Sequence, residues 1–277
     1  MVPILNHSPE KHQGQRLWLL AGTGEGPLLA AQMLQRGWRV RVSVVTAAAA
    51  AAYRPLADGS GGAALEVAVG ALAGPAAINA ALELARQQGD PFAALIDATH
   101  PFAQQISRDL AVVCAGLGLP LLRLGRVLEH SGTATVLPDL AALQACDLAG
   151  QRVLLALGAR QLAAAVASSP GALHHARVLP APAALQQALA AGLDPSRIAL
   201  LRPSHDFAVE TALVRHWMIS AIVCRQSGGR TEAGWREVSQ CCGCQLMVLA
   251  RPAEAPTVVP LSEQALLATL ETLAAGG

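Results

Sequence analysis

Short apolar, β-branched runs alternate along this chain with longer Ala- and Leu-rich segments of helical length. Strands of a parallel sheet are buried on both faces and are joined through helices, so a parallel α/β fold produces this alternation. In the first half the pattern predicts strands at 16–21, 39–45, 65–69, 94–97 and 119–124. The clearest helices between them are expected at 27–36, 75–88 and 103–117.

The second half repeats the alternation, which predicts a second α/β lobe of similar size. Its strands are expected near 152–157, 176–179, 197–201, 221–224 and 246–250, and its helices at 161–168, 183–191, 208–216 and 234–242. The segment 126–150, which contains Gly132 and Pro138, is the natural hinge. We therefore expect a flexible leader at 1–15, an N-terminal lobe at 16–130 and a C-terminal α/β lobe at 131–277.

Composition narrows the class of protein. Of the 277 residues 53% are hydrophobic and 14% are charged, which excludes a disordered chain. A formal charge of +1 gives no field for generic binding of nucleic acid or of an anionic membrane. The most apolar run, 40–52, contains Arg41 and is too short to span a membrane. We expect a soluble, cytoplasmic protein with neither nucleic acid nor membrane as partner.

Six cysteines raise the question of a metal site or a disulfide framework. Cys241, Cys242 and Cys244 lie together, but no second Cys/His pair follows at zinc-ligand spacing. We interpret them as small buried residues at the end of a helix and expect no metal site.

A glycine-rich loop follows the first strand and leads directly into a helix. It reads Gly22-Thr23-Gly24-Glu25-Gly26. Glycines let the backbone approach a phosphate, and a helix N-terminus favours the negative charge of that phosphate. The alternative is a tight turn that binds no ligand. Glu25 then either caps N–H groups or faces another ligand group.

The end of the second strand bears on the choice of cofactor. It carries Ser43 and Thr46 but no acid of the kind that binds the ribose hydroxyls of NAD, and Arg39 and Arg41 lie in the same strand. Hydroxyls and arginines suit a 2′-phosphate, which favours NADPH over NADH. Gly70, after the third strand, allows another close approach to the cofactor.

An acid, a hydroxyl and an imidazole follow the fourth strand, as Asp97, Thr99 and His100. Asp97 can orient either neighbour, and His100 can donate or accept a proton near neutral pH. The alternative is that Asp97 or Thr99 caps the next helix while His100 packs against the chain. Arg123 and Arg126 follow at the end of the fifth strand.

Arginine recurs after the strands of the second lobe, which indicates a polyanionic ligand. Such a ligand is either a dinucleotide or a substrate with many carboxylates. The strand ends carry Arg160, Arg202, Arg225 and Arg251, with Ser227 and Gly228 following Arg225 and His205-Asp206 following Arg202.

These motifs together resemble the precorrin-6A reductase family, also called cobalt-precorrin-6A reductases. The likeness covers 17–252 and is carried by GTGEG at 22–26, DATHPFA at 97–103 and LPLLRLGR at 119–126. In the second lobe Gly158-Ala159-Arg160, Ser227-Gly228 and Arg251-Pro252 match the family in type and order. The chain departs from the family at Arg202-Pro203-Ser204-His205, where a Gly-Pro-Phe-Ser type segment is usual.

The resemblance implies two Rossmann-like lobes with an active site in the cleft between them. It implies reduction of the precorrin-6A macrocycle to its dihydro form in cobalamin biosynthesis, with NADPH as reductant and NADH as the alternative. The tetrapyrrole is then the main partner, handed over by neighbouring pathway enzymes. The sequence leaves open whether that macrocycle carries cobalt.

We can then assign expected roles to the candidate residues. Thr99, His100 and Asp97 form the catalytic group, and either His100 or water supplies the proton. The cofactor is expected on Gly22, Thr23, Gly24, Glu25, Gly26, Ser43, Thr46 and Gly70. Substrate carboxylates are expected on Arg123, Arg126, Arg160, Arg202, Arg225, Ser227 and Gly228.

Two rival functions remain. A non-catalytic NADP(H)-binding sensor has a similar first lobe but does not need arginines at so many strand ends. A methyltransferase that uses S-adenosylmethionine also has a glycine-rich first loop, but it normally carries an acid after the second strand. The segment 43–46 has none.

Overall fold

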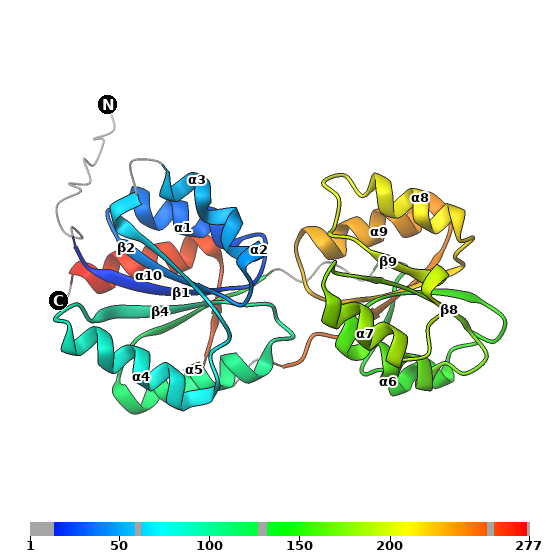
Figure 1. The fold of residues 1–277 in the computed structure, drawn as a ribbon, viewed down its shortest axis with the longest axis horizontal. Coiled ribbons are helices and arrows are strands. Elements are labelled where there is room, and N and C mark those ends of the chain that lie inside the picture. The colour runs from blue at the N-terminus through cyan, green and yellow to red at the C-terminus, as the bar shows by residue number, and fades with distance from the viewer. Residues whose placement is uncertain (1–13, 59–61, 127–131, 254–257, 276–277) are drawn as a thin grey trace. The chain divides into compact units, whose positions relative to one another are not determined.

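A computed structural model describes residues 14–58, 62–126, 132–253 and 258–275. The chain divides into two compact units (Figure 1). Unit 1 comprises 1–126 and 252–277, and unit 2 comprises 127–251. Each unit is a sheet of parallel strands covered by helices, which confirms the predicted α/β class.

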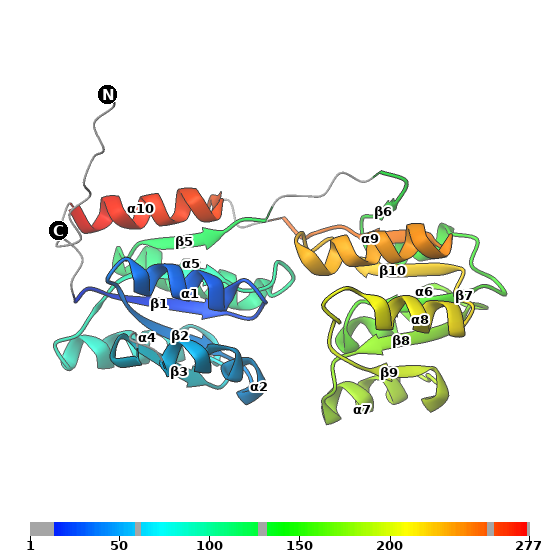
Figure 2. The same cartoon turned by 90° about the horizontal axis from the view of Figure 1, so that it is seen from above.

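Unit 1 has a six-stranded parallel sheet in the order β12-β5-β4-β1-β2-β3. The strands are β1 Arg16–Ala21, β2 Arg39–Val44, β3 Leu65–Val69, β4 Phe92–Ala98, β5 Leu121–Leu124 and β12 Pro260–Leu261. The helices are α1 Gly26–Gln35, α2 Ala47–Ala50, α3 Arg54–Ala57, α4 Gly74–Gln87, α5 Gln104–Leu117 and α10 Glu263–Ala275. Helices cover both faces of this sheet (Figure 1), and Figure 2 looks onto the face that α1 covers.

The alternation of side chains along β1 explains the two layers of core in unit 1. Leu17 and Leu19 pack on one face with residues of α1 and α10. Trp18 and Leu20 pack on the other face with residues of α4 and α5. Because successive side chains of a strand point to opposite faces, one buried strand contributes to both cores.

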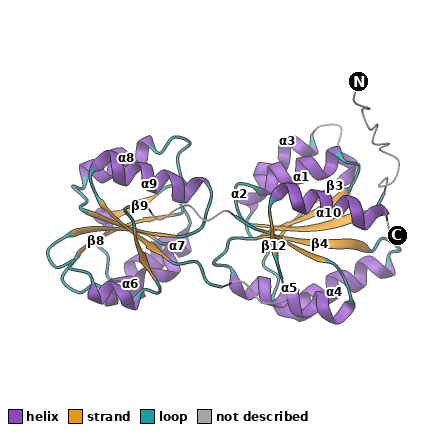
Figure 3. Cartoon of the chain, turned by 180° about the vertical axis from the view of Figure 1, so that it is seen from behind, coloured by secondary structure: helices purple, strands orange, loops and turns teal. Residues whose placement is uncertain are grey.

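Unit 2 has a second six-stranded parallel sheet, in the order β6-β11-β10-β7-β8-β9. The strands are β6 Thr135–Leu137, β7 Arg152–Ala156, β8 Leu173–Val178, β9 Ile198–Leu200, β10 Ala221–Arg225 and β11 Gln245–Leu249. The helices are α6 Leu162–Ser168, α7 Pro182–Ala190, α8 Ala208–His216 and α9 Arg230–Cys242. Figure 3 shows them covering both faces of the sheet.

The two units differ from the predicted lobes at the C-terminus. The prediction assigned 131–277 to the second lobe, but 252–277 belongs to unit 1. There β12 pairs in parallel with β5, and a Cβ on Gly125 would lie 2.8 Å from the Cβ of Pro260. Glycine at 125 therefore permits this docking. Of the predicted leader, 1–13 lies outside the described residues.

The structure also bears on the predicted hinge and on the cluster of three cysteines. The predicted hinge 126–150 contains a strand, β6, which pairs with β11. The three clustered cysteines do lie at the end of α9, but Cys241 is exposed and Cys242 and Cys244 are only half-buried, so the prediction that they are buried was wrong. Within the described ranges, no helix combines the length and apolar character that a membrane span requires.

Candidate functional site

The loops that follow the strands of unit 1 bring most of the predicted residues to one edge. Every strand pairing in its sheet is parallel, so the carboxyl ends of β1, β2, β4 and β5 meet at the same edge. Ligands of doubly wound sheets bind outside this edge. The glycine-rich loop after β1 and the Thr99–His100 segment after β4 therefore belong to neighbouring strands.

The glycines of the first loop divide into two kinds. Gly22 and Gly24 are exposed, have no positive φ, and a Cβ on either would meet nothing within 4 Å. Neither backbone strain nor packing within the described structure demands glycine there. Gly26 differs, because a Cβ there would lie 2.2 Å from the hydroxyl oxygen of Tyr53 and 2.9 Å from the Cβ of Ala21. Gly26 serves the packing of α1, whereas Gly22 and Gly24 leave open space above the loop.

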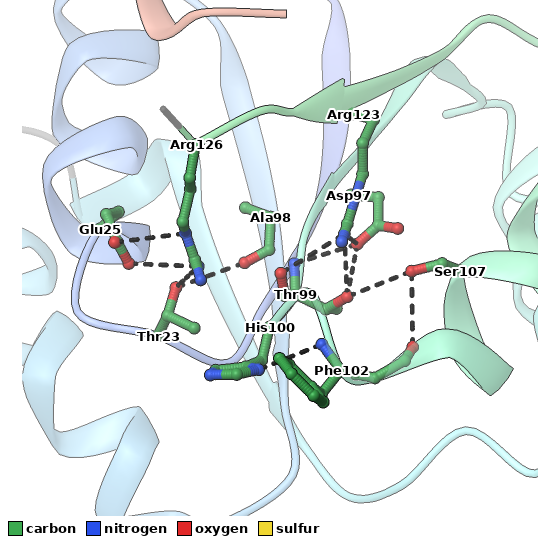
Figure 4. A network of polar contacts seen from close by, with 11 residues as sticks. Thr23, Glu25, Asp97, Ala98, Thr99, His100, Phe102, Ser107, Arg123 and Arg126 are labelled. Carbon is green, nitrogen blue, oxygen red and sulfur yellow. Dashed lines mark hydrogen bonds and ion pairs between the residues drawn. The ribbon is translucent and has the colours of Figure 1, made fainter. Parts of the chain in front are cut away.

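An arginine from the end of β5 holds this loop (Figure 4). Arg126 donates from Nη2 to the hydroxyl of Thr23 at 2.8 Å, and its Nε lies 3.3 Å from Oε1 of Glu25. Thr23 in turn donates to the carbonyl of Ala98 at 3.4 Å. The acid in the loop is therefore neutralised by Arg126, and this arginine, expected on substrate, fixes the loop.

A buried ion pair lies beneath the loop after β4. Arg123 and Asp97 are paired across the sheet, with 2.6 Å between Nη1 and Oδ1, and both side chains are 2% exposed. Asp97 also accepts from the amide and the hydroxyl of Thr99, at 3.0 and 2.7 Å. Arg123 was expected to bind a substrate carboxylate, and here its guanidinium is buried and paired with Asp97. Asp97 orients Thr99, not His100.

The His100 ring has a defined hydrogen-bonding role. Its Nδ1 accepts from the amide of Phe102 at 3.2 Å. In the neutral ring the proton is therefore on Nε2, which can donate it. Figure 4 shows the imidazole beside the Phe102 ring, on the far side of Thr99 from Asp97. His100 is half-buried.

The residues expected to hold the adenosine end lie at or near the ends of β2 and β3, and most have partners within the protein. Ser43 accepts from the indole of Trp18 at 2.8 Å, and Thr46 caps α2 by accepting from the amide of Ala49 at 3.2 Å. Gly70 is exposed, with φ +142°.

The two arginines of β2 do not reach this edge, which corrects the support expected from them for a 2′-phosphate. Arg39 begins β2 at the amino edge, where it forms a bidentate pair with Asp90 at 2.8 and 2.7 Å. Arg41, in mid-strand, lies 3.5 Å from Glu66 and over the ring of Trp18.

In unit 2 the predicted residues also share one carboxyl edge, because its strand pairings are all parallel. Arg160 and Arg202 are exposed, whereas Arg225 is half-buried. Burial lowers the pKa of Arg225. Ser227 is buried, and the Gly228 amide donates to Glu232 at 2.8 Å.

Sequence reasoning missed four residues at these edges. They are Tyr53, whose pKa burial raises, and the buried charged residues Arg177, Glu210 and Glu232. A signal was present for Arg177, since it interrupts the apolar end of β8. None was present for the two glutamates, because helices carry such residues routinely on exposed faces.

Comparison with known proteins gives a consistent result over nearly the whole chain. Residues 16–271 match the family described as "Precorrin-6x reductase CbiJ/CobK". A cobalt-precorrin-6A reductase from Synechocystis sp. is 33% identical over 246 residues, which is 87% of this chain and 90% of that protein. A precorrin-6A reductase from Mycobacterium tuberculosis is 29% identical over 242 residues, covering 86% and 89%.

A solved structure agrees with both sequence relatives. The structure of a CobK precorrin-6A reductase matches with a TM-score of 0.71 and 25% identity, covering 94% of this chain and 97% of that one. The fold and the coverage of the chain thus point the same way. The chain belongs to the precorrin-6x reductase CbiJ/CobK family, oxidoreductases of cobalamin biosynthesis that act on a CH–CH bond.

Proposed function

We propose that this protein reduces the precorrin-6A macrocycle, with or without cobalt, to its dihydro form and takes the hydride from NADPH. The observation that carries the proposal is the loop 22–26. This loop lies at the N-terminus of α1 and at the carboxyl edge of the parallel sheet. The space beside Gly22 and Gly24 is empty, and packing within the described structure does not explain why glycine stands at either position. Membership of the reductase family supports the reaction.

The residues at this edge fit a dinucleotide. The amides at the start of α1 and the open space over Gly22 and Gly24 suit a phosphate. Glu25 does not oppose that charge, because Arg126 neutralises it. Ser43 and Thr46 can still donate their hydroxyl protons to the ribose end, since the contacts they make here use their oxygens as acceptors. NADPH is our proposal for the cofactor and NADH is the alternative.

The nicotinamide supplies a hydride to one macrocycle carbon when the cofactor is bound. The chain then has to position the macrocycle and to deliver a proton to the neighbouring carbon. His100 can provide that proton from Nε2, because its Nδ1 is held by the Phe102 amide. Thr99 is oriented by Asp97 beside it and positions the reacting end.

The arginines of unit 2 would bind the substrate's peripheral carboxylates. Arg160 and Arg202 are exposed at the carboxyl edge, and Arg225 lies at the end of β10. The guanidinium group matches a carboxylate in shape and charge. Hand-over of the macrocycle from a neighbouring pathway enzyme is part of the same proposal.

The test is oxidation of NADPH, followed at 340 nm, with precorrin-6A and with its cobalt form as separate substrates. We expect oxidation only when a macrocycle is present, and faster turnover with one form names the natural substrate. NADH should be used less well than NADPH. NADPH binding with neither macrocycle reduced would contradict the proposal and favour the sensor. Binding of S-adenosylmethionine in its place would favour the methyltransferase.

A further inference from the structure

A buried arginine of unit 2, Arg177, has donors that lack partners. It is the penultimate residue of β8 and is 8% exposed. Within the described part of the chain, neither its Nε nor its Nη2 makes a hydrogen bond. Burying charged donors without acceptors costs free energy, so we expect these nitrogens to bind an acceptor.

The nearest carboxylate does not satisfy these donors. Glu210 of α8 is fully buried, and its Oε1 lies 3.9 Å from Nη2 of Arg177, beyond hydrogen-bond distance. Its oxygens accept instead from Ser204, from the amide at 3.0 Å and from the hydroxyl. Glu210 therefore holds the loop after β9 and leaves the edge of the Arg177 guanidinium unbonded.

A second arginine adds positive charge at the same place. Arg225, from β10, lies against Gly158, where a Cβ would be 3.1 Å from its Nη2. Gly158 has φ +87°, and it follows β7, which separates β10 from β8 in the sheet. Burial lowers the pKa of Arg177, Glu210 raises it, and Arg225 lowers it further. Arg225 thus adds positive charge on the side of Arg177 that faces the end of β7.

We propose that Arg177, with Arg225 beside it, forms a subsite for one carboxylate of the macrocyclic substrate. The proposal rests on the proposed function. Nε and Nη2 are the two nitrogens of one edge of a guanidinium, and their parallel N–H bonds match the two oxygens of a carboxylate. These are the two atoms without hydrogen-bond partners among the described residues. The side chain as a whole keeps 10% exposure, whereas Nε and Nη2 are enclosed, so a carboxylate reaches them only when the side chains around them shift.

The test is equilibrium binding of precorrin-6A without any reduced cofactor, followed by quenching of tryptophan fluorescence. Arg177→Met removes the donors that would bind the carboxylate. It should therefore raise the Kd about tenfold or more, which corresponds to ~1.4 kcal/mol. Arg177→Lys keeps the charge but not the paired donors, so its Kd should rise by a smaller factor. Glu210→Gln removes the opposing negative charge and should lower the Kd severalfold.

Arg152→Met is the matched control. Arg152 begins β7 at the opposite edge of the same sheet and donates to the carbonyl of Trp217, so we expect an unchanged Kd. The Kd for NADPH, measured separately, should not change in any variant.

Three outcomes would overturn the proposal. An unchanged Kd for precorrin-6A in the Arg177 variants would mean that the arginine is structural, and so would weaker binding by Glu210→Gln. Loss of NADPH affinity in the Arg177 variants would assign the site to a cofactor phosphate. Failure of the wild type to bind precorrin-6A would instead contradict the proposed function. If Arg177→Met does not fold, Arg177→Lys and Glu210→Gln decide the question.

Discussion

Substitutions of Gly22 and Gly24 should affect the binding of NADPH without affecting the stability of the fold. Gly22→Ala and Gly24→Ala place a methyl group in open space, so the fold should tolerate both. The same methyl group occupies the volume proposed for a phosphate. We therefore expect the Kd for NADPH to rise about tenfold or more, ~1.4 kcal/mol, with little change in the urea midpoint. An unchanged Kd in both variants would contradict the cofactor assignment.

Gly26→Ala should show the opposite behaviour, because its methyl group collides with the Tyr53 hydroxyl. Overpacking of this kind costs about 1–3 kcal/mol. Tyr53→Phe removes the hydroxyl, which has no hydrogen-bond partner among the described residues, and should itself be nearly neutral. The double variant should recover part of the lost stability, because the methyl group still lies 2.9 Å from the Cβ of Ala21. Additive losses in urea unfolding would disprove the contact.

The proposed role of His100 as proton donor can be tested by substitution. His100→Asn offers an oxygen to the Phe102 amide in place of Nδ1 but has no Nε2 proton. We expect kcat to fall about a hundredfold, within the usual range for a lost general acid, with the NADPH Kd unchanged. His100→Ala should lower turnover at least as far. Unchanged turnover in both variants would assign the proton to water.

The different roles of Arg123 and Arg126 could not be predicted from the sequence. Arg123 and Arg126 follow the same strand three residues apart, and spacing predicts the same role for both. Their different roles come from strand register and loop geometry: Arg123 lies opposite Asp97 in the sheet, whereas Arg126 extends past the strand to Thr23. Partners set by pairing between distant strands are invisible in a single sequence.

At the scale of elements, β8 carries two histidines whose protonation opposes folding. Burial lowers the pKa of His174 and of His175 from the ordinary 6.5, and His175 also packs against Trp217. Below pH 6.5 the unfolded chain therefore binds more protons than the folded one. Stability should fall as the pH is lowered, by about 1.4 kcal/mol for each histidine and each pH unit between its two pKa values.

Urea unfolding at pH 7.5 and at pH 5.5 measures this loss. The double variant His174→Gln/His175→Asn should lose less stability between the two pH values than the wild type. Equal losses in both proteins would show that other groups cause the acid sensitivity.

Long strands were predictable from their apolar runs, and short edge strands were not. The core strands β1 and β4 coincide with the predicted runs to within two residues. In contrast, β6 has three residues and β12 has two, too few for any periodicity. No element was predicted after 250, although Leu266, Leu267 and Leu270 of α10 have helical spacing. The prolines before that helix suggest a linker and hide the return of the chain to unit 1.

At the scale of the whole molecule, the class of fold and the family could both be read from the sequence. Alternating strands and helices, and motifs at the ends of several strands, were sufficient. The boundary of the second unit could not be read from the sequence, because it depends on where the last 25 or so residues pack. Edge pairing of β12 with β5 fixes that boundary.

The most direct test of the account is the transfer of deuterium from NADPH to the macrocycle. NADPH with deuterium at one or the other face of nicotinamide C4 is incubated with precorrin-6A or its cobalt form, and the product is analysed by mass spectrometry. We predict that one of the two labelled forms adds a single deuterium to a macrocycle carbon. The second new hydrogen should come from solvent and carry deuterium only in D₂O. A reduced product without label from either form of NADPH would contradict hydride transfer.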